Sequence, residues 1–334
     1  MLRVEPVVPE LWCDADWQRC YELHGSAHRE QGGTPRSLAA YRLAHAPVPG
    51  ALLKRYWVAR DGLAIVGKLD FAIVDSTSGE ATLALYVMPE SRRRGVARAL
   101  LRNMLPIAEQ HKTRRVHAGA ASPLNWSICE RLGGQVEHTT LRQSLSLEHA
   151  NWRLAQEWGQ SVQRARSTRI ESFESLPDEL AVAFLELQQS IWAEFPQALT
   201  QANAAPTLAL RREEERRHQL LGSRWLTLVT REPDATISGV TDVTYDPLQP
   251  ELVRQNLTAV LPRYRGTGLA KWLKAAMLFS IRDQFPSATQ LLTVNAADNP
   301  AMLEINRKLG FAGVVQQRVY GFELALLRAA LGPE

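Results

Sequence analysis

One short basic motif occurs twice in this chain, and each copy lies between a strand-like segment and a helix-like one. The copies are Arg92–Ala97, with the sequence RRRGVA, and Arg263–Gly268, with RYRGTG. Each follows an apolar run that ends in proline, at 83–89 and 257–262, which predicts a strand, a glycine turn and a helix. Glycine lets the backbone approach a phosphate, and the start of a helix offers unpaired N–H groups. The sequence therefore predicts two anion sites.

The two halves of the chain match beyond this motif. A shift of about 171 positions superimposes residues of the first half on residues of the second, with order and spacing kept. The matched pairs are Arg60 with Arg231, Arg92 with Arg263, Gly95 with Gly266, and Gly67 and Asp70 with Gly239 and Asp242. Farther along the chain the shift grows by about six positions, and it then pairs Pro123 with Pro300 and Leu132-Gly133 with Leu309-Gly310. A period this long favours two complete domains over a solenoid of short repeats. We expect the domains at 1–147 and 168–334, joined by a linker helix at 148–167.

Length and composition agree with two globular domains. The 334 residues are 45% hydrophobic, and the formal net charge of +4 suits an anionic ligand. The chain is only mildly basic and is expected to be globular, which argues against a nucleic-acid partner. Three cysteines, Cys13, Cys20 and Cys129, have neither the spacing of a metal site nor the even number of a disulfide framework. We expect no metal, no membrane span and a reducing, cytoplasmic location.

Hydrophobic periodicity predicts the same order of elements in both halves. The predicted strands lie near 2–8, 53–60, 63–74, 81–88, 115–120 and 135–147, then near 169–173, 224–230, 236–245, 252–261, 290–295 and 313–326. The predicted helices lie near 14–30, 35–44, 95–111 and 123–132, then near 178–195, 208–221, 267–284 and 300–309. Three consecutive strands before each glycine turn indicate an α/β (α+β) fold with a mixed, mostly antiparallel sheet flanked by helices. The charged run 211–217 is interpreted as a solvated helix face.

The element order and the Arg-x-x-Gly-x-Gly/Ala turn resemble the GNAT superfamily of acetyl-CoA-dependent N-acetyltransferases. The resemblance covers nearly the whole chain as two GNAT-like domains in tandem, an arrangement similar to that of mycothiol synthase. It implies acetyl-CoA as co-substrate, with the pyrophosphate in the glycine turn and the pantetheine arm along the preceding strand. The implied cofactor-binding residues of the turns are Arg263, Arg265, Gly266, Thr267, Gly268, Leu269 and Ala270 in the second domain and Arg93, Arg94, Gly95, Val96 and Ala97 in the first.

In this family a backbone N–H of a splayed strand polarises the thioester carbonyl. The resemblance places this N–H at Val260 or Leu261 in the second domain and at Val87 or Met88 in the first.

A further family pattern has an Asn at the start of the last helix and a Tyr seven residues later. The second half keeps Asn299, which is expected to cap the helix and reach the pantetheine arm, whereas the first half has Ser122. The Tyr, which often protonates the departing CoA thiolate, is replaced by Cys129 and Asn306. The second domain therefore keeps more of the cofactor pattern, and the motif supplies no general acid.

Catalytic candidates come from the strands around the second turn. Asp242, which recurs as Asp70, is the candidate base, and its alternative role is a structural carboxylate that caps a bulge or pairs with arginine. Tyr320 on the last strand is the candidate acid, and its alternative role is core packing. The family shapes its acceptor pocket at the position of Trp192, Glu194, Phe195 and Pro196.

The expected function is transfer of an acetyl group from acetyl-CoA to a primary amine of a small molecule, with the C-terminal domain active. A non-catalytic acyl-CoA-binding sensor or scaffold is the alternative, because both halves lack the Tyr. A different acyl chain or a protein amine as acceptor also stays open. A Walker-type NTPase is disfavoured because neither turn carries Gly-Lys-Ser/Thr. We expect a monomer or homodimer whose partner is the small-molecule amine, with neither nucleic acid nor membrane involved.

Overall fold

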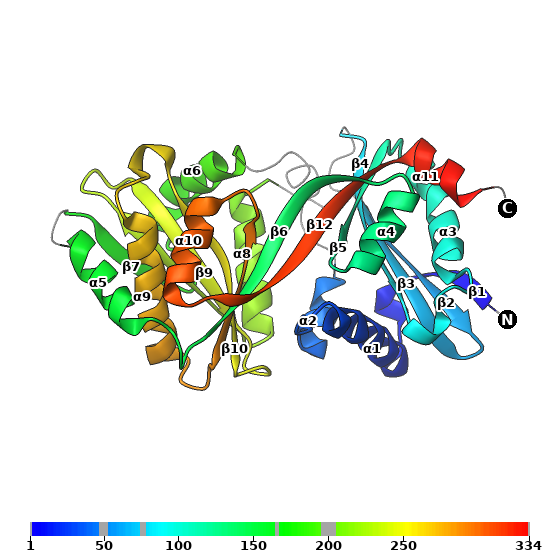
Figure 1. Ribbon diagram of the computed structural model, residues 1–334, viewed down its shortest axis with the longest axis horizontal. Coiled ribbons are helices and arrows are strands. Elements are labelled where there is room, and N and C mark those ends of the chain that lie inside the picture. Colours follow the sequence, from blue (N-terminus) through cyan, green and yellow to red (C-terminus); the bar gives the residue numbers. More distant parts are fainter. Residues whose placement is uncertain (1, 47–52, 74–77, 164–166, 195–204, 333–334) are drawn as a thin grey trace. The chain divides into compact units, whose positions relative to one another are not determined.

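The computed structural model describes residues 2–46, 53–73, 78–163, 167–194 and 205–332. The described chain forms two compact units. Unit 1 contains the described residues of 2–139 together with 315–332, and unit 2 contains those of 140–194 together with 205–314. In each unit helices cover both faces of a sheet (Figure 1). The expected α/β class with a mixed sheet is confirmed.

The sheet of unit 1 is antiparallel except at one place. In the described residues its strands have the order β1 (Leu2–Val7), β2 (Leu53–Asp61), β3 (Ala64–Ile73), β4 (Glu80–Val87), β5 (Arg115–Ala120) and β12 (Ala312–Glu323). Only β4 and β5 run parallel among these pairs. One face carries α3 (Val96–Gln110), α4 (Pro123–Arg131) and α11 (Leu324–Leu331), and the other carries α1 (Asp14–Glu30) and α2 (Leu38–Ala44).

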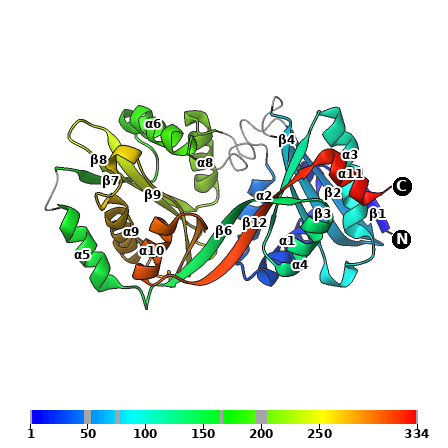
Figure 2. The ribbon, with the colours of Figure 1, turned by 45° about the horizontal axis from the view of Figure 1, so that its top comes forward.

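Unit 2 repeats this plan. Its described strands have the order β6 (Gln135–Ser146), β11 (Gln290–Ala296), β10 (Leu252–Val260), β9 (Ile237–Tyr245), β8 (Arg224–Arg231) and β7 (Arg169–Phe173), and β10 and β11 form the parallel pair. Figure 2 shows the helices on either side of these strands. One face carries α5 (Trp152–Gln163), α9 (Leu269–Gln284) and α10 (Pro300–Leu309), and the other carries α6 (Ala181–Trp192) and α8 (Leu208–Leu220).

The outermost strand of each unit comes from the other half of the chain. Residues 318–323 of β12 pair with β5 in unit 1, and residues 140–146 of β6 pair with β11 in unit 2. The compact units therefore differ from the expected ranges 1–147 and 168–334. Strand periodicity gives the buried face of a strand but not its partner, so the sequence could not show this exchange. The expected linker at 148–167 contains α5, which buries Ala155 and Trp158 in the core of unit 2.

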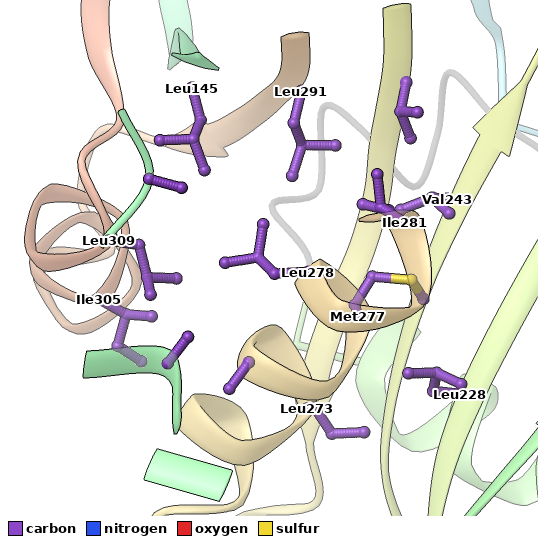
Figure 3. Close-up of a cluster of buried hydrophobic side chains, with 14 of the residues drawn as sticks. Leu145, Leu228, Val243, Leu273, Met277, Leu278, Ile281, Leu291, Ile305 and Leu309 are labelled. Carbon is purple, nitrogen blue, oxygen red and sulfur yellow. The ribbon is translucent and has the colours of Figure 1, made fainter. Parts of the chain in front are cut away.

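The core of unit 2 lies between the sheet and α9. Figure 3 shows Leu273, Met277 and Ile281 of α9 beside Leu228 and Val243 of the sheet. Their spacing of four residues gives α9 one apolar face, which is buried against the strands. Burying each such side chain contributes about 1.5–3 kcal/mol. This packing fixes α9 behind β10, with its first turn at the end of that strand.

Two glycines that recur in the halves let the helix lie close to the sheet. A Cβ on Gly67 would lie 2.7 Å from Val96 of α3, and a Cβ on Gly239 would lie 2.9 Å from Leu273 of α9. Real Cβ atoms do not approach so closely, so a larger residue would push the helix outward. These glycines therefore set the position of the helix that follows each glycine turn.

The charged run 211–217 is not a solvated face throughout. Arg211 and Glu215 are buried and form an ion pair of 2.8 Å. The Arg211 guanidinium lies 3.5 Å from the centre of the Trp225 ring, and Leu176 donates its backbone N–H to Glu215. The sequence interpretation was therefore wrong for these two residues, because the i, i+4 pair lies on the face of α8 that meets the sheet.

Candidate active site

Each glycine turn has the same backbone path, which corrects the sequence match between the copies. Gly95 and Gly268 occupy the N-cap positions of α3 and α9 with φ of 81° and 90°. Two residues earlier, Arg93 and Gly266 also have positive φ, 61° and 75°. Gly95 thus corresponds to Gly268 rather than to Gly266. The shift of about 171 positions that was used to match the halves is two positions too short at the turn.

The turns leave the starts of α3 and α9 open for an anion. A glycine N-cap has no side chain to pair with the first N–H groups of the helix. By contrast, Ser122 caps α4 and Asn299 caps α10 through the side-chain oxygen, at 3.3 and 3.1 Å. The expected capping role of Asn299 is therefore confirmed. The expected phosphate-binding residues Val96, Ala97, Leu269 and Ala270 lie in the first turns of the two open helices.

One arginine in each turn holds the turn to its own unit. Arg92 donates from Nε to the Val87 carbonyl at 3.3 Å, and Arg265 donates to the Val260 carbonyl at 3.1 Å. Their outer nitrogens pair with carboxylates, Arg92 with Glu30 at 2.6 Å. Arg265 forms the matching pair with Glu194 at the end of α6.

These pairs divide the expected phosphate arginines into two groups. Arg265 is committed to the strand end and to Glu194, and Arg94 pairs with Asp61 at 2.9 Å. Arg93 is exposed at the turn of unit 1, and Arg263 is exposed at the turn of unit 2, where its guanidinium lies over the Tyr264 ring. Arg263 and Arg93 are therefore the better placed of the expected residues for a solvent-borne anion.

Beside each turn, two parallel strands part. The pairing of β4 with β5 ends at Leu83 and Ala118, although β4 continues to Val87. The pairing of β10 with β11 ends at Gln255 and Thr293, although β10 continues to Val260. Each unit therefore has a length of strand with one edge open, running from the point of divergence to the glycine turn.

Of the two matching strands β4 and β10, only β10 carries a bulge in this region. Its register against β9 shifts between Gln255 and Thr258, whereas β4 pairs with β3 without a shift. A bulge adds one residue, turns the strand and leaves backbone groups out of the ladder. Both units thus have the splayed strand that the family resemblance implies, and only in unit 2 is the matching strand also bulged.

The expected base Asp242 holds this bulge from the α8 face. Its Oδ1 accepts hydrogen bonds from Trp225 Nε1 at 2.9 Å and from Asn256 Nδ2 at 2.8 Å. The backbone N–H of Leu257 also donates to the carboxylate. Burial raises the pKa of Asp242 in spite of these donors. Asp242 thus caps the bulge, which was its alternative role. Its raised pKa also suits a general base.

A second carboxylate near Asp242 was not foreseen from the sequence. Glu214 lies on α8, and its pKa is raised by partial desolvation and, to a smaller extent, by the charge of Asp242. Unlike Asp242, Glu214 is an exposed residue. The sequence could not identify Glu214, because it is one of several charged residues in a row. Only the packing of α8 shows which of them interacts with Asp242.

Two expected backbone donors are already bonded. The Leu261 N–H donates to the Ser238 carbonyl at 2.9 Å, and the Met88 N–H donates to the Val66 carbonyl at 3.0 Å. They are therefore not free to polarise a thioester, and that part of the expectation was wrong. Of the expected donors, Val260 and Val87 remain as candidates, each at the end of its strand.

Tyr320, the expected acid of the second domain, belongs to unit 1. It lies on β12 opposite Ala118, is completely buried, and donates its hydroxyl to Glu130 at 3.2 Å. Tyr320 therefore cannot be the acid of unit 2, and its role is the alternative one of core packing in unit 1. The exchange of the last strands is the reason, because β12 follows α10 in sequence but completes the other sheet.

The position of the missing Tyr in unit 2 is taken by a buried amide. Asn306 donates from Nδ2 to Gln143 Oε1 at 3.1 Å, and its side chain is completely buried. In unit 1, burial raises the pKa of Cys129, at the matching position, to about 11. The amide of Asn306, in the unit proposed to be active, is not a proton donor of the kind that the Tyr provides.

A buried lysine on α9 also escaped the sequence analysis. Lys274 donates to Gln255 Oε1 at 2.7 Å, and Gln255 Nε2 donates to Thr241 Oγ1 at 2.9 Å and to Thr258 Oγ1 at 3.3 Å. This network supports the bulge from the α9 face. Burial lowers the pKa of Lys274 to about 7. Lys274 follows Leu273 in an apolar helix, and nothing in the sequence predicts that its side chain is buried and supports the bulge.

The Lys274→Met variant is expected to be more stable than the wild type at pH 6 and to lose much of this advantage by pH 9. Between the folded pKa of about 7 and the ordinary lysine pKa of 10.5, the unfolded chain binds one more proton than the folded chain. Lys274 therefore opposes folding below pH 7, and this penalty falls by at most about 1.4 kcal/mol per pH unit above it. Urea unfolding at the two pH values measures the change. Lys271→Met, at an exposed position of α9, should show a pH-independent difference, and an equal pH dependence in both variants would contradict the burial of the charge.

A pocket of about 360 Å³ adjoins the turn of unit 2 on the α6 face. It is lined by Ala183, Glu186, Leu187, Ser190, Thr236, Ile237, Leu261, Pro262 and Arg263. Of the four residues expected at the acceptor pocket, Trp192 and Glu194 lie at the C-terminal end of α6, near the Arg265 pair. Phe195 and Pro196 lie outside the described residues.

Residues 17–132 match the model of the acetyltransferase (GNAT) family, and these residues lie in unit 1. Over 100% of both chains, the fold is similar to a tandem GNAT protein from the clavulanic acid biosynthesis pathway, with a TM-score of 0.80 and 22% identity. No sequence among the curated proteins matches the chain.

Two further solved structures share the fold. A GCN5-related N-acetyltransferase from Sphaerobacter thermophilus has a TM-score of 0.70 and 15% identity, over 97% of this chain and 96% of that one. A glucosamine N-acetyltransferase region in a fungal multi-domain GH3 β-N-acetylglucosaminidase has a TM-score of 0.67 and 15% identity, over 96% of this chain and 38% of that one.

The chain therefore has an α/β fold that it shares with solved structures of GNAT proteins. More narrowly, residues 17–132 match the acetyltransferase (GNAT) family, and the chain has the fold of a tandem GNAT protein over its whole length. This relationship supports acyl transfer in general. In the described part of the chain, no helix is both long and apolar enough to cross a membrane.

Proposed function

We propose that the chain transfers an acetyl group from acetyl-CoA to a primary amine of a small molecule, and that unit 2 performs the transfer. The observation that carries this proposal is the bulged, splayed strand β10 next to the uncapped start of α9. The matching strand of unit 1 lacks the bulge. Family relationship supports the reaction class, and this difference supports the choice of unit.

The chain's own groups suit the two ends of acetyl-CoA. The first N–H groups of α9 and the exposed Arg263 receive the pyrophosphate. From the turn back to the divergence, β10 offers the five residues Asn256–Val260, which span about 16 Å of open strand edge for the pantetheine arm. The thioester then lies near the bulge, where the strand direction changes.

The acceptor amine needs to lose a proton before it attacks the thioester carbon. Asp242 is proposed to receive that proton, directly or through water, because it lies at the bulge and burial raises its pKa. The amine nitrogen forms a bond to the carbonyl carbon, and the C–S bond then breaks. An alkyl thiol has a pKa of about 8.5, so the departing thiolate takes a proton readily from water and does not require the missing Tyr.

The alternative function is a non-catalytic acyl-CoA sensor or scaffold. It is favoured by one observation: the buried Asn306 and the partly buried Cys129 stand at the positions where the family has its proton-donating Tyr. In that case the chain binds acetyl-CoA but releases no CoA in the presence of amines.

Acetyl-CoA titration and CoA release separate these functions. The full chain is titrated with acetyl-CoA by calorimetry, and free thiol is then measured with a panel of small amines that includes glucosamine, the acceptor named for one structural neighbour. We expect binding and amine-dependent thiol release for at least one acceptor. Binding without release across the panel would favour the sensor, and the absence of binding would contradict both functions.

A further inference from the structure

Unit 1 contains a buried lysine in the middle of its sheet. Lys68 lies on β3, and its side chain is 1% exposed. Gly67 and Asp70 correspond to Gly239 and Asp242, so the matching residue in unit 2 is Val240, which packs in an apolar cluster. The fold itself therefore does not require a lysine at this position. A buried ammonium costs several kcal/mol of folding free energy unless polar partners surround it.

Two acceptors contact the Lys68 ammonium. Its Nζ lies 2.6 Å from His45 Nε2 and 2.8 Å from Asp70 Oδ2. His45 Nδ1 lies 2.8 Å from the Tyr41 carbonyl oxygen, so Nδ1 carries the hydrogen and Nε2 offers its lone pair to Lys68. Burial and the charge of Lys68 lower the pKa of His45 to about 4, so the imidazole is neutral near pH 7.

Aromatic rings complete the surroundings of the ammonium. Lys68 Nζ lies 5.3 Å from the centre of the Tyr41 ring and 5.4 Å from the centre of the Tyr56 ring. Burial raises the pKa of both phenols, so both rings are neutral. A carboxylate, an imidazole lone pair and two aromatic faces are the groups by which proteins recognise an ammonium ion. We call Tyr41, His45, Tyr56 and Asp70 the ammonium pocket.

The ammonium pocket lies on the face of unit 1 that carries α1 and α2. In the pairing of β3 with β4, Lys68 lies opposite Tyr86 and Asp70 lies opposite Ala84. These residues of β4 follow directly after Leu83, where β4 parts from β5. The ammonium is therefore held beside the splayed strand of the unit, on the face where unit 2 has Asp242.

We propose that the ammonium pocket is a binding site for a primary alkylammonium group and that Lys68 fills it from within. Unit 1 then keeps its glycine turn, but Lys68 already occupies the position beside Asp70 that an external amine would take. This proposal concerns ammonium binding in unit 1 and stands whether or not unit 2 transfers acetyl groups. It also explains why Asp70, although it recurs as Asp242, is not free to act as a base.

Chemical rescue of the Lys68→Ala variant tests the proposal. The substitution removes the three outer carbons and the ammonium, which together have the shape of n-propylammonium. Millimolar n-propylammonium chloride should raise the Tm of the variant saturably, by about 3 °C or more at concentrations well above its Kd, because the ligand binds only the folded state. The wild type should show no such rise. n-Propanol, which has no charge, should have a much smaller effect.

Matched variants separate recognition of the ammonium from simple filling of a cavity. Lys68→Met retains a side chain of similar length and should not respond to n-propylammonium. Lys68→Ala combined with Asp70→Asn lacks the counter-charge and should lose most of the response. If Lys68→Ala folds only in the presence of a ligand, refolding yield in n-propylammonium is compared with yield in n-propanol. Equal effects of the two probes, or an equal response of the Asp70→Asn double variant, would overturn the proposal.

Discussion

Replacement of Gly266 by glutamate is expected to abolish the acetyl-transfer activity that we propose for unit 2. Gly266 has φ of 75°, and no atom lies within 4 Å of a Cβ built on it. The new side chain therefore meets no neighbouring atom, although the positive φ strains any residue with a Cβ, and its carboxylate is placed at the anion site. Like charges in such contact cost several kcal/mol, so kcat/KM should fall at least about a hundredfold. Steady-state thiol release and acetyl-CoA titration measure the effect.

The matched control is Arg93→Glu in unit 1. Arg93 occupies the corresponding position of the first turn with φ of 61°, and it is exposed. Its replacement should weaken acetyl-CoA binding in unit 1 and leave the turnover rate nearly unchanged. The opposite pattern, with turnover lost in Arg93→Glu and kept in Gly266→Glu, would move the active site to unit 1. Thermal unfolding of both variants shows whether positive φ, rather than charge, is responsible.

Replacement of Asp242 by asparagine is expected to lower kcat about a hundredfold or more, the contribution typical of a positioned general base. Asparagine keeps an oxygen that accepts from Trp225 and Asn256, so the bulge should persist and the KM for acetyl-CoA should change little. In the wild type, kcat should rise with pH through the raised pKa of this carboxyl, because the base acts in its ionised form. The pH profile of the variant should lack that rise.

Glu214→Gln is the control for this experiment. Glu214 shares the neighbourhood of Asp242, but it is an exposed residue and its pKa is also raised. If Asp242 is the base, Glu214→Gln should reduce kcat much less than Asp242→Asn does. A larger loss in Glu214→Gln, together with a lowered Tm in Asp242→Asn, would identify Glu214 as the base and leave Asp242 with its bulge-capping role alone.

The glycine turns show how far local sequence determines a site. Proline, arginine and glycine set the conformation of a few residues, and the chain forms the expected open helix start in both units. The alignment between the copies was nevertheless wrong by two positions. Arg265 corresponds to Arg92 because both bind a strand-end carbonyl and a carboxylate, and neither partner is visible in a motif.

The residues that the sequence analysis missed or misplaced all depend on packing between distant segments. Lys274 looked like one polar residue in an apolar helix, and Arg211 looked solvated, yet both are buried. Tyr320 was assigned to the wrong site because its strand completes the sheet of unit 1. A strand pattern states which face is buried, whereas the neighbouring strand is chosen by the free energy of the whole sheet.

Local patterns were sufficient to predict the α/β class, the repeated strand, turn and helix, and the cap at Asn299, because periodicity, glycine and capping act over a few neighbouring residues. Local patterns did not predict the exchange of the last strands, the bulge that distinguishes β10 from β4, or the different surroundings of Asp242 and Asp70. These features arise from contacts between residues far apart in the chain. Their free energies depend on burial and on partners, which no local pattern records.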